Sequence, residues 1–287
     1  MNVVDTYCQE KTARSGSSFY YSFLFLPAAE REAITALYAF CREVDDVVDD
    51  CSDRNIAQRK LDWWRQEIAE IFHGNPQHPV GKALALHLRT KPQAQAWLLE
   101  IVAGMEMDLT FQGYATMADL EVYCHKVAGV VGMLAALLFG FQNPATLEYA
   151  QKLGLAFQMT NIIRDVREDV FRGRIYLPKE DLDQFHLSYA DIEQLQNNDA
   201  FNRLLQFEVA RAKTCYQTAL SMLPEEDRYA QRVGLMMAAI YQTLLAEIET
   251  DPLQVLQGRV KLAPLRKLWI AWRTARQEKK RFDQQQQ

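Results

Sequence analysis

The sequence has few of the residues from which disulfide-rich, zinc or iron proteins are built. Its 287 residues include five cysteines without a Cys-x-x-Cys pair and five histidines without a His-Glu-x-x-His motif. An odd, scattered set of cysteines predicts reduced, structural thiols rather than a disulfide framework. The histidines do not supply the two Glu-x-x-His motifs of a di-iron bundle, and no zinc site is expected.

Signatures of nucleotide, nucleic-acid and secreted proteins are also missing. The chain has no Gly-Lys-Ser/Thr phosphate loop and no Gly-x-Gly-x-x-Gly turn, and its formal net charge is −5. A negative protein is a poor partner for nucleic acid. Residues 1–18 are polar, so no signal peptide is expected and the chain is predicted to be cytoplasmic.

Strand-like alternation and long apolar runs are absent as well. No internal repeat or linker divides the chain, which predicts one all-α domain over residues 1–287, with a polar and partly disordered tail from about 273. The most apolar run, residues 127–141, contains 15 residues without a charge, fewer than the ~20 residues that span a bilayer, and is expected to be a buried helix. The expected helices cover residues 5–14, 27–50, 53–72, 80–89, 93–113, 119–141, 148–169, 188–197, 200–222, 225–250 and 262–281.

What the chain does have is an acidic cluster in an apolar helix at residues 38–50. Tyr38, Arg42, Asp45 and Asp49 follow steps of four, three and four, which places them on one helical face. Aspartate is a poor residue for a helix interior, and carboxylates four residues apart repel. Local structure gains nothing from this arrangement, so we expect another group to neutralise it.

A second face of this kind lies more than a hundred residues later. Gln158, Asn161, Asp165 and Asp169 follow steps of three, four and four, and Arg164 and Arg172 flank them. Two solvated faces are the simpler interpretation, but the intervening residues are Val, Ile and Met rather than polar ones. Two acidic faces in apolar helices favour a functional pair. Glu106 and Asp108, in contrast, belong to no such pattern and are interpreted as structural or solvated.

Two facing carboxylate pairs predict a magnesium site. Hard oxygen ligands suit Mg²⁺, which is typically held by one or two carboxylates together with substrate phosphates. A cluster of two or three Mg²⁺ ions held by both motifs would bind a diphosphate that the carboxylates alone would repel. The predicted ligands are Asp45, Asp49, Asn161, Asp165 and Asp169.

The paired sequences Asp-Asp-Val-Val-Asp at 45–49 and Asp-Val-Arg-Glu-Asp at 165–169 resemble the twin motifs of the squalene/phytoene synthase family. Ser-Phe-Tyr-Tyr at 18–21, the segment 123–132 and Arg-Ile-Tyr-Leu-Pro at 174–178 resemble family segments in the same order. The resemblance covers residues 15–260. It implies an isoprenoid-synthase-type helical bundle with a central apolar cavity. Segment 15–27 most resembles bacterial presqualene diphosphate synthases of hopanoid pathways.

The resemblance also implies roles for single residues. The four aspartates, Tyr38 and Arg42 become the expected catalytic set. Loop 15–18 alone predicts a helix cap, whereas the resemblance places it at the diphosphate; some relatives carry a basic residue there, where this chain has serines. The expected substrate-binding residues are Ser18, Phe19, Tyr123, Gln158, Asn161, Arg164, Tyr176, Tyr241 and Arg259. Whether Gln158 and Asn161 bind metal, water or phosphate stays open.

The implied reaction is the head-to-head condensation of two farnesyl diphosphates to presqualene diphosphate. NADPH is not expected for this first step, and a downstream squalene-forming enzyme is a plausible partner. Alternatives are a complete NADPH-dependent squalene synthase, a phytoene or dehydrosqualene synthase, and a non-catalytic lipid-binding scaffold. Head-to-tail chain elongation is disfavoured because the first motif lacks the paired arginines that usually follow it.

Two segments, residues 119–141 and the C-terminal segment, each allow two structural interpretations. The small residues in 119–141, such as Gly129, Gly132 and Ala135, favour close helix packing or room for an isoprenoid chain equally. The C-terminal segment mixes Trp269 and Trp272 with many basic residues, Lys267 among them. It predicts a last helix docked on the bundle or, alternatively, a helix lying on an anionic membrane surface.

Overall fold

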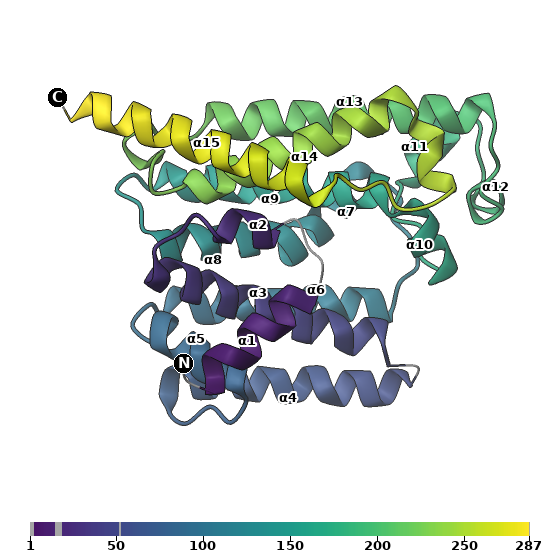
Figure 1. Cartoon of the computed structure of the whole chain (residues 1–287). Helices are drawn as coiled ribbons and strands as arrows, with labels where there is room; N and C mark the ends of the chain where they lie inside the picture. The colour runs from purple at the N-terminus through teal and green to yellow at the C-terminus, as the bar shows by residue number, and fades with distance from the viewer. Residues whose placement is uncertain (1–2, 15–18, 52, 287) are drawn as a thin grey trace.

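The computed structural model describes residues 3–14, 19–51 and 53–286, and within these ranges every regular element is a helix (Figure 1). The predicted all-α class is therefore confirmed. The long helices are α3 (Ala28–Asp49), α4 (Arg54–His73), α6 (Gln93–Leu109), α9 (Ala145–Arg164), α13 (Asp199–Ser221), α14 (Arg232–Thr250) and α15 (Pro264–Gln285). The shorter ones are α1 (Val3–Arg14), α2 (Phe19–Phe23), α5 (Pro79–Leu88), α7 (Met117–Cys124), α8 (Val130–Phe139), α10 (Val166–Phe171), α11 (Lys179–Gln184) and α12 (Tyr189–Glu193).

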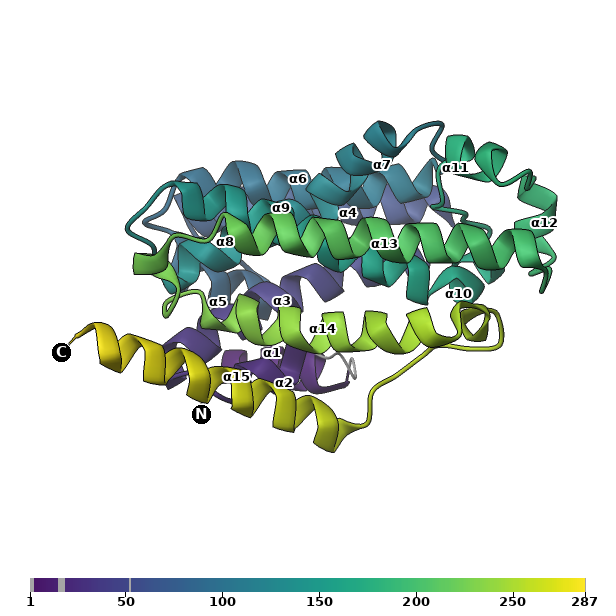
Figure 2. The same ribbon diagram turned by 90° about the horizontal axis from the view of Figure 1, so that it is seen from above.

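The long helices lie roughly along one direction and form layers (Figures 1 and 2). Helices α13, α14 and α15 lie on one side, α4 and α5 on the other, and α3, α6, α8 and α9 lie between them. Helix α9 packs against both α8 and α13, and α14 packs against α15. Because α3 and α9 both lie in the interior, the two acidic motifs are placed inside the bundle rather than on its surface.

Helix ends follow signals that the sequence carries. Asp53 caps α4 by accepting hydrogen bonds from the backbone N–H groups of Asn55 and Ile56. Ser188 and Asp191 form the capping box predicted for α12. That helix nevertheless ends at Glu193 rather than at residue 197, because Leu195 adopts a positive φ of 49° that a helix does not accept.

The predicted helix over residues 119–141 is present as Met117–Phe139, but one part of it is not α-helical. Helices α7 and α8 are joined by a π-helical segment, η1 (His125–Gly129), whose wider turn lies against α6 and α9. The glycines of this region serve close packing. A Cβ on Gly132 would lie 2.3 Å from the Ala150 carbonyl oxygen, and one on Gly154 would lie 2.4 Å from that of Ala128. Larger residues at these positions would force α8 and α9 apart.

The region Met117–Phe139 is the one helical stretch in the described ranges that is long and apolar enough to cross a membrane, with a mean hydropathy of 1.8. Length and composition alone give this result. Val127, Val131 and Ala135 from this stretch line an internal cavity, so their partial exposure faces the inside of the bundle. The observed packing favours a helix of the protein core.

The predicted helix over residues 148–169 is also wrong at one point. Helix α9 ends at Arg164, Asp165 adopts φ −101° and ψ 11°, and α10 begins at Val166. The Asp165 carboxylate accepts a hydrogen bond from Arg164 Nε at 2.7 Å and lies 2.9 Å from Arg259 Nε. These two guanidinium contacts hold an aspartate at the point where the helix breaks.

Three further boundaries differ from the prediction. Helix α6 ends at Leu109 rather than at residue 113, and residues 225–250 divide into a 3-10 turn, Glu225–Asp227, and α14. Helix α15 continues through Gln285, where disorder was expected. The reason is docking: Glu278 accepts two hydrogen bonds from Arg228, at 2.7 and 2.9 Å, and Phe282 stacks on Tyr229 with ring centroids 4.4 Å apart.

Candidate active site

A cavity of about 620 Å³ lies between α3, α8, α9 and α14. This volume falls in the range of small-molecule binding sites. Its inner part is lined by apolar side chains such as Leu37, Val131 and Leu153, whereas acids and arginines gather at another part of its wall. Apart from Ser18, which lies outside the described residues, every residue predicted from the sequence for the site lines this cavity.

The first acidic motif occupies the C-terminal turns of α3. Arg42 donates hydrogen bonds to Asp45 at 2.6 Å and to Asp46 at 2.5 Å. Asp49 is the last residue of the helix, and no basic residue occupies the final turn. Carboxylates at this end of a helix face the negative pole of its dipole, which disfavours them. The last carboxylate of the motif, Asp49, is held instead by partners from elsewhere in the chain.

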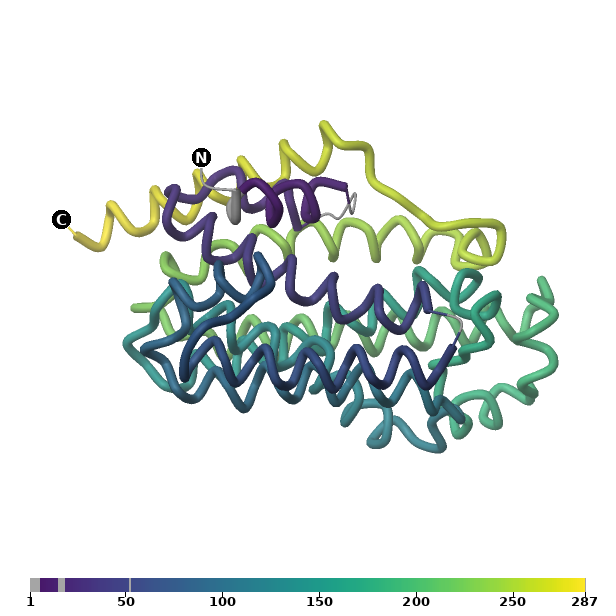
Figure 3. The backbone as a smooth tube through the Cα atoms, turned by 90° about the horizontal axis from the view of Figure 1, so that it is seen from below, coloured from purple at the N-terminus to yellow at the C-terminus, as the bar shows by residue number. Residues whose placement is uncertain are grey.

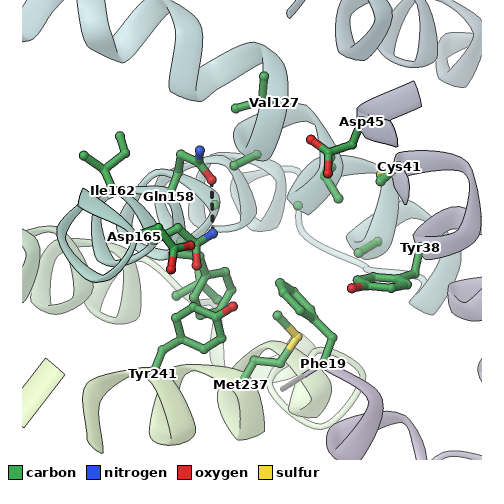
Figure 4. Close-up of a pocket in the computed structure, with 18 of the residues that line it drawn as sticks. Phe19, Tyr38, Cys41, Asp45, Val127, Gln158, Ile162, Asp165, Met237 and Tyr241 are labelled. Carbon is green, nitrogen blue, oxygen red and sulfur yellow. Dashed lines mark hydrogen bonds between the residues drawn. The ribbon is translucent and has the colours of Figure 1, made fainter. Parts of the chain in front are cut away.

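Those partners come from the segment that follows the second motif. Arg174 donates to Asp49 at 2.9 Å, and Arg172 lies 3.2 Å from the other oxygen of the same carboxylate. The two motifs are more than a hundred residues apart in sequence, yet these ion pairs join the first motif to the segment that follows the second, and the backbone N–H of Arg174 donates to the Asp169 carbonyl oxygen at 2.9 Å. Figure 4 shows Asp45 and Asp165 on opposite sides of the pocket. The expected facing arrangement of the two motifs is present.

The second motif straddles the break between α9 and α10. Arg164, which is almost fully buried, and Arg259, from the loop before α15, bind the Asp165 carboxylate. Asp169 lies in the first turn of α10. On each side of the cavity one aspartate, Asp49 or Asp165, is thus contacted by two guanidinium groups.

The other aspartate of each motif has a shifted pKa. Burial, together with the Asp49 charge, raises the pKa of Asp45 to about 6. Burial, together with the Asp165 charge, raises the pKa of Asp169 to about 8. A group in these surroundings gains from a nearby cation, because the cation offsets both the lost hydration and the repulsion between the carboxylates.

Of the two interpretations of Asp108, structural or solvated, the solvated one is wrong. It is buried against the cavity and accepts hydrogen bonds from the hydroxyls of Tyr123 at 2.9 Å and Tyr176 at 2.8 Å. Burial raises the pKa of Asp108 to about 6 despite these bonds. The Tyr123 and Tyr176 rings stack with centroids 5.3 Å apart. Glu106 is structural as expected, because it accepts a hydrogen bond from Gln58 at 2.7 Å and pairs with Arg65.

Aromatic rings form another part of the cavity wall (Figure 4). The Phe19 ring lies 5.6 Å from that of Tyr38 and 5.8 Å from that of Tyr241, and Phe157 lies 4.9 Å from Tyr241. The faces of such rings stabilise a nearby positive charge. Cys41 also lines the cavity, and burial raises the pKa of its thiol to about 12, which disfavours the thiolate form. None of the five cysteines, all of which the structure describes, is in a disulfide, in line with the predicted reduced thiols.

The donor set fits a hard divalent cation in its chemistry. Two buried oxygens at the cavity, Asn161 Oδ1 and Glu168 Oε2, have no hydrogen-bond partner. The Asn161 amide donates to Gln158 Oε1 at 3.1 Å, which leaves its own oxygen available as a ligand (Figure 4). In the described ranges no three acidic, histidine or cysteine side chains already converge at metal-binding distance. The arginines hold the carboxylates instead, so metal binding requires these ion pairs to rearrange.

Several cavity residues are not in the predicted set. Asp108, Glu168, Arg172, Arg174, Lys261 and Lys267 all line it. Arg172 and Arg174 carried a signal, since they follow the second motif closely. Lys267 was placed with the basic residues of the C-terminal face, but it is buried and its ammonium lies 5.3 Å from the centre of the Tyr21 ring. Its side chain points inward because it shares a face with Ile270 and Ala271.

The sequence profile of the squalene/phytoene synthase family matches residues 12–266. The 15-cis-phytoene synthase of Synechocystis sp. is 35% identical over 92% of this chain and 83% of its own length. The phytoene synthase of Mycobacterium tuberculosis is 36% identical over 91% of this chain and 86% of its own.

Solved structures give the same result. A dehydrosqualene synthase in complex with ligand superposes with a TM-score of 0.83 at 29% identity, over 96% of this chain and 97% of its own. The squalene synthase HpnC from Alicyclobacillus acidocaldarius superposes with a TM-score of 0.75, also at 29% identity, over 87% of this chain and 94% of its own. The matches in sequence and in fold span the same two motifs and cavity, and the chain belongs to the squalene/phytoene synthase family.

Proposed function

We propose that this protein condenses two prenyl diphosphates head to head (1′-1) with the help of Mg²⁺. The observation that carries the proposal is the pairing of Asp49, on the first motif, with Arg172 and Arg174, which follow the second. This pairing places acids and guanidinium groups together at one part of an otherwise apolar cavity. A diphosphate with a hydrocarbon tail has the matching polarity.

The acidic and the basic residues of the cavity have different roles. When bound, Mg²⁺ withdraws charge from a departing diphosphate, and Asp45, Asp49, Asn161, Asp165 and Asp169 would hold it. Arginines are suited to diphosphate oxygens because the guanidinium group offers several donors in one plane. The cavity arginines that serve here are Arg42, Arg164, Arg172, Arg174 and Arg259.

The carbon chemistry belongs to the apolar part of the cavity. The first diphosphate leaves with the electron pair of its C–O bond, and an allylic cation remains. The rings of Phe19, Tyr38 and Tyr241 stabilise that cation, and the apolar walls exclude the water that would capture it. The C2–C3 alkene of the second substrate then attacks the cation, and loss of a proton closes a cyclopropane that keeps the second diphosphate.

For the product we propose presqualene diphosphate, formed from two farnesyl diphosphates without NADPH. The resemblance of residues 15–27 to presqualene diphosphate synthases supports it. A second candidate is phytoene formation from two geranylgeranyl diphosphates, which the names of the curated relatives favour. The two candidates share the first step and differ in chain length and in the fate of the second diphosphate.

A product assay tests both proposals. Purified protein is incubated with farnesyl or geranylgeranyl diphosphate and Mg²⁺, with and without NADPH, and the products are identified by mass spectrometry. A cyclopropyl C30 diphosphate that accumulates in both farnesyl reactions supports the first candidate, whereas squalene formed only with NADPH replaces it. Phytoene from the longer substrate supports the second. If neither substrate is consumed, the condensation itself is refuted and a lipid-binding scaffold takes its place.

A further inference from the structure

Helix α15 lies at the outer edge of the molecule, next to α14 and α2 (Figures 2 and 3). Its inner side is buried through residues such as Ile270 and Ala271. Its outer side carries three large apolar residues, Leu265, Trp269 and Trp272, which are 80%, 54% and 46% exposed. Their spacing of four and three places them in one row along the helix. Tryptophan is a costly residue to leave in water, so a row that contains two of them calls for a partner.

Basic residues continue and flank this row. Arg276 and Lys279 extend it at steps of four and three, while Arg273 and Lys280 lie beside it, and all four are exposed. The guanidinium of Arg273 lies 5.3 Å from the Trp269 ring centroid, and that of Arg276 lies 5.4 Å from the Trp272 centroid. Helix α15 has seven basic and two acidic residues, although the whole chain has a net charge of −5. The charge of this helix is therefore opposite to that of the molecule.

Docking of α15 onto the bundle does not account for these residues. The ion pairs that hold the helix use Arg266 with Glu247, Glu278 with Arg228, and Arg281 with Glu225. The row of Trp269 and Trp272 with its basic neighbours faces away from those contacts.

A second copy of the chain is a poor partner for this face. A two-fold interface through it would bring two basic rims together, and like charges in contact oppose association. An anionic lipid surface complements both features. Tryptophan prefers the region of the lipid headgroups, and each nearby Lys or Arg adds an attraction to anionic lipid.

We propose that the outer face of α15 binds an anionic lipid surface, with Trp269 and Trp272 at headgroup depth and the basic residues at the phosphates. Helix α2 packs against α15, and two exposed apolar side chains lie in and directly after it, Tyr20 and Leu24. The docking goes beyond the proposed function and does not depend on it. Phe19 of α2 and Lys267 of α15 line the cavity, so the elements at the lipid surface also form part of the cavity wall.

Vesicle flotation tests this proposal with the full chain and without substrate or metal. The protein is mixed with vesicles of phosphatidylcholine alone or of phosphatidylcholine with phosphatidylglycerol, at low and high salt. We expect binding to the anionic vesicles that weakens as salt rises. Replacing both Arg273 and Arg276 by Gln should weaken it by about thirtyfold, since each charge near the surface contributes on the order of fivefold. The variant Trp269→Ala/Trp272→Ala should weaken binding to neutral and anionic vesicles alike.

Matched control variants distinguish binding through this face from nonspecific binding of exposed tryptophan and arginine side chains to vesicles. Trp63, which is 41% exposed on α4 across the bundle, provides Trp63→Ala, and the exposed Arg203 on α13 provides Arg203→Gln. The proposal is refuted if the controls weaken binding as much as the α15 variants, if neutral vesicles bind equally well, or if no vesicle binds. It is also refuted if the wild type is a dimer that the double Trp variant converts to a monomer, because the face would then bind a second copy. Circular dichroism and thermal unfolding confirm that each variant is folded.

Discussion

The two acidic motifs have the same spacing but different backbones. In the first, α3 runs without interruption through Asp45 and ends at Asp49; in the second, the helix breaks at Asp165 and restarts before Asp169. Both solutions present two carboxylates to one cavity. The comparison shows that the side-chain arrangement is kept while the local backbone differs.

The two aspartates with shifted pKa values, Asp45 and Asp169, also differ in their electrostatic surroundings. Asp45 lies near the negative end of a long helix, whereas Asp169 lies in the first turn of α10, at its positive end. The helix dipole alone would lower the pKa of Asp169 below that of Asp45. The opposite is found, about 8 against about 6. A dipole is worth about 0.3–1 kcal/mol, less than one pKa unit, so burial and the neighbouring carboxylate outweigh it.

The largest expected effect would test whether the two motifs are equivalent. Asp49→Asn and Asp165→Asn should each lower turnover by about a thousandfold or more, because each removes a metal ligand that stabilises the leaving diphosphate. The measurement is kcat with prenyl diphosphate and Mg²⁺, alongside the helical circular dichroism signal. Asp62→Asn, in an exposed ion pair with Arg65 on α4, is the control. Normal turnover in either motif variant would show that its motif has no part in catalysis.

The next largest effect compares Arg174, which pairs with the first motif, with Arg259, which binds only the second. Arg174→Gln removes a contact that joins the two motifs and should lower kcat/KM by about a hundredfold, since a partly buried charge pair is broken. Arg259→Gln acts on the second motif only, and Arg164 still binds Asp165, so a loss of about tenfold is expected. Equal losses would show that bridging the motifs has no separate importance.

The pH dependence of stability sharpens the contrast between Asp45 and Asp169. The folded-state pKa of Asp169, about 8, lies above its ordinary value of 3.8, so the folded protein binds this proton more tightly than the unfolded chain does. Without divalent metal, the free energy of unfolding should therefore fall as pH rises from about 4 to about 8. The slope from this group is at most about 1.4 kcal/mol per pH unit.

Urea unfolding at several pH values in the presence of a chelator measures this slope. Asp169→Asn should make it shallower between about pH 6 and pH 8, where Asp45 no longer contributes, and the slope that remains comes from Glu208, whose pKa burial also raises. Asp45→Asn should flatten it only below about pH 6. An unchanged slope in Asp169→Asn would mean that this carboxylate is not the buried acid described above.

The smallest effect concerns the tyrosine cluster beside the motifs. Tyr176→Phe removes one of the two hydroxyl bonds to Asp108 and should lower stability by about 1–2 kcal/mol. Tyr114→Phe is the matched control, because its ring lies 6.3 Å from that of Tyr176 while the Asp108 oxygens accept from Tyr123 and Tyr176. Thermal unfolding of both variants compares them. A greater loss in the Tyr114 variant would contradict the assignment.

Much of the site was visible in the sequence because helical spacing is a local property. Steps of three and four placed Asp45 with Asp49, and Asn161 with Asp165, on common faces that now line one cavity. The break at Asp165 was not predictable, because it accompanies contacts with Arg259, ninety-four positions away. Asp108 was missed for the same reason: its two hydroxyl partners come from α7 and from the segment before α11.

The direction in which a single side chain points could not be predicted from the sequence either. Lys267 belongs to a helix of basic residues, and only the packing of α15 on its neighbours shows that this one points inward. Small residues gave an ambiguous signal for a different reason. Gly132 is required by close backbone contact and also lines the cavity, together with Val131 and Ala135 of the same stretch, so both interpretations of the small residues hold.

The π-helical segment η1 changes the directions in which the side chains before and after it point. Four residues at intervals of four line the cavity: Tyr123, Val127, Val131 and Ala135. In a regular α-helix each such interval advances the direction of the side chain by about 40°, so the row would rotate through about a third of a turn. The wider turn at His125–Gly129 takes back part of that rotation and keeps the row directed at one volume. A π turn holds one residue more than an α turn in nearly the same rotation, so Tyr123 before the segment and Val131 after it face one volume.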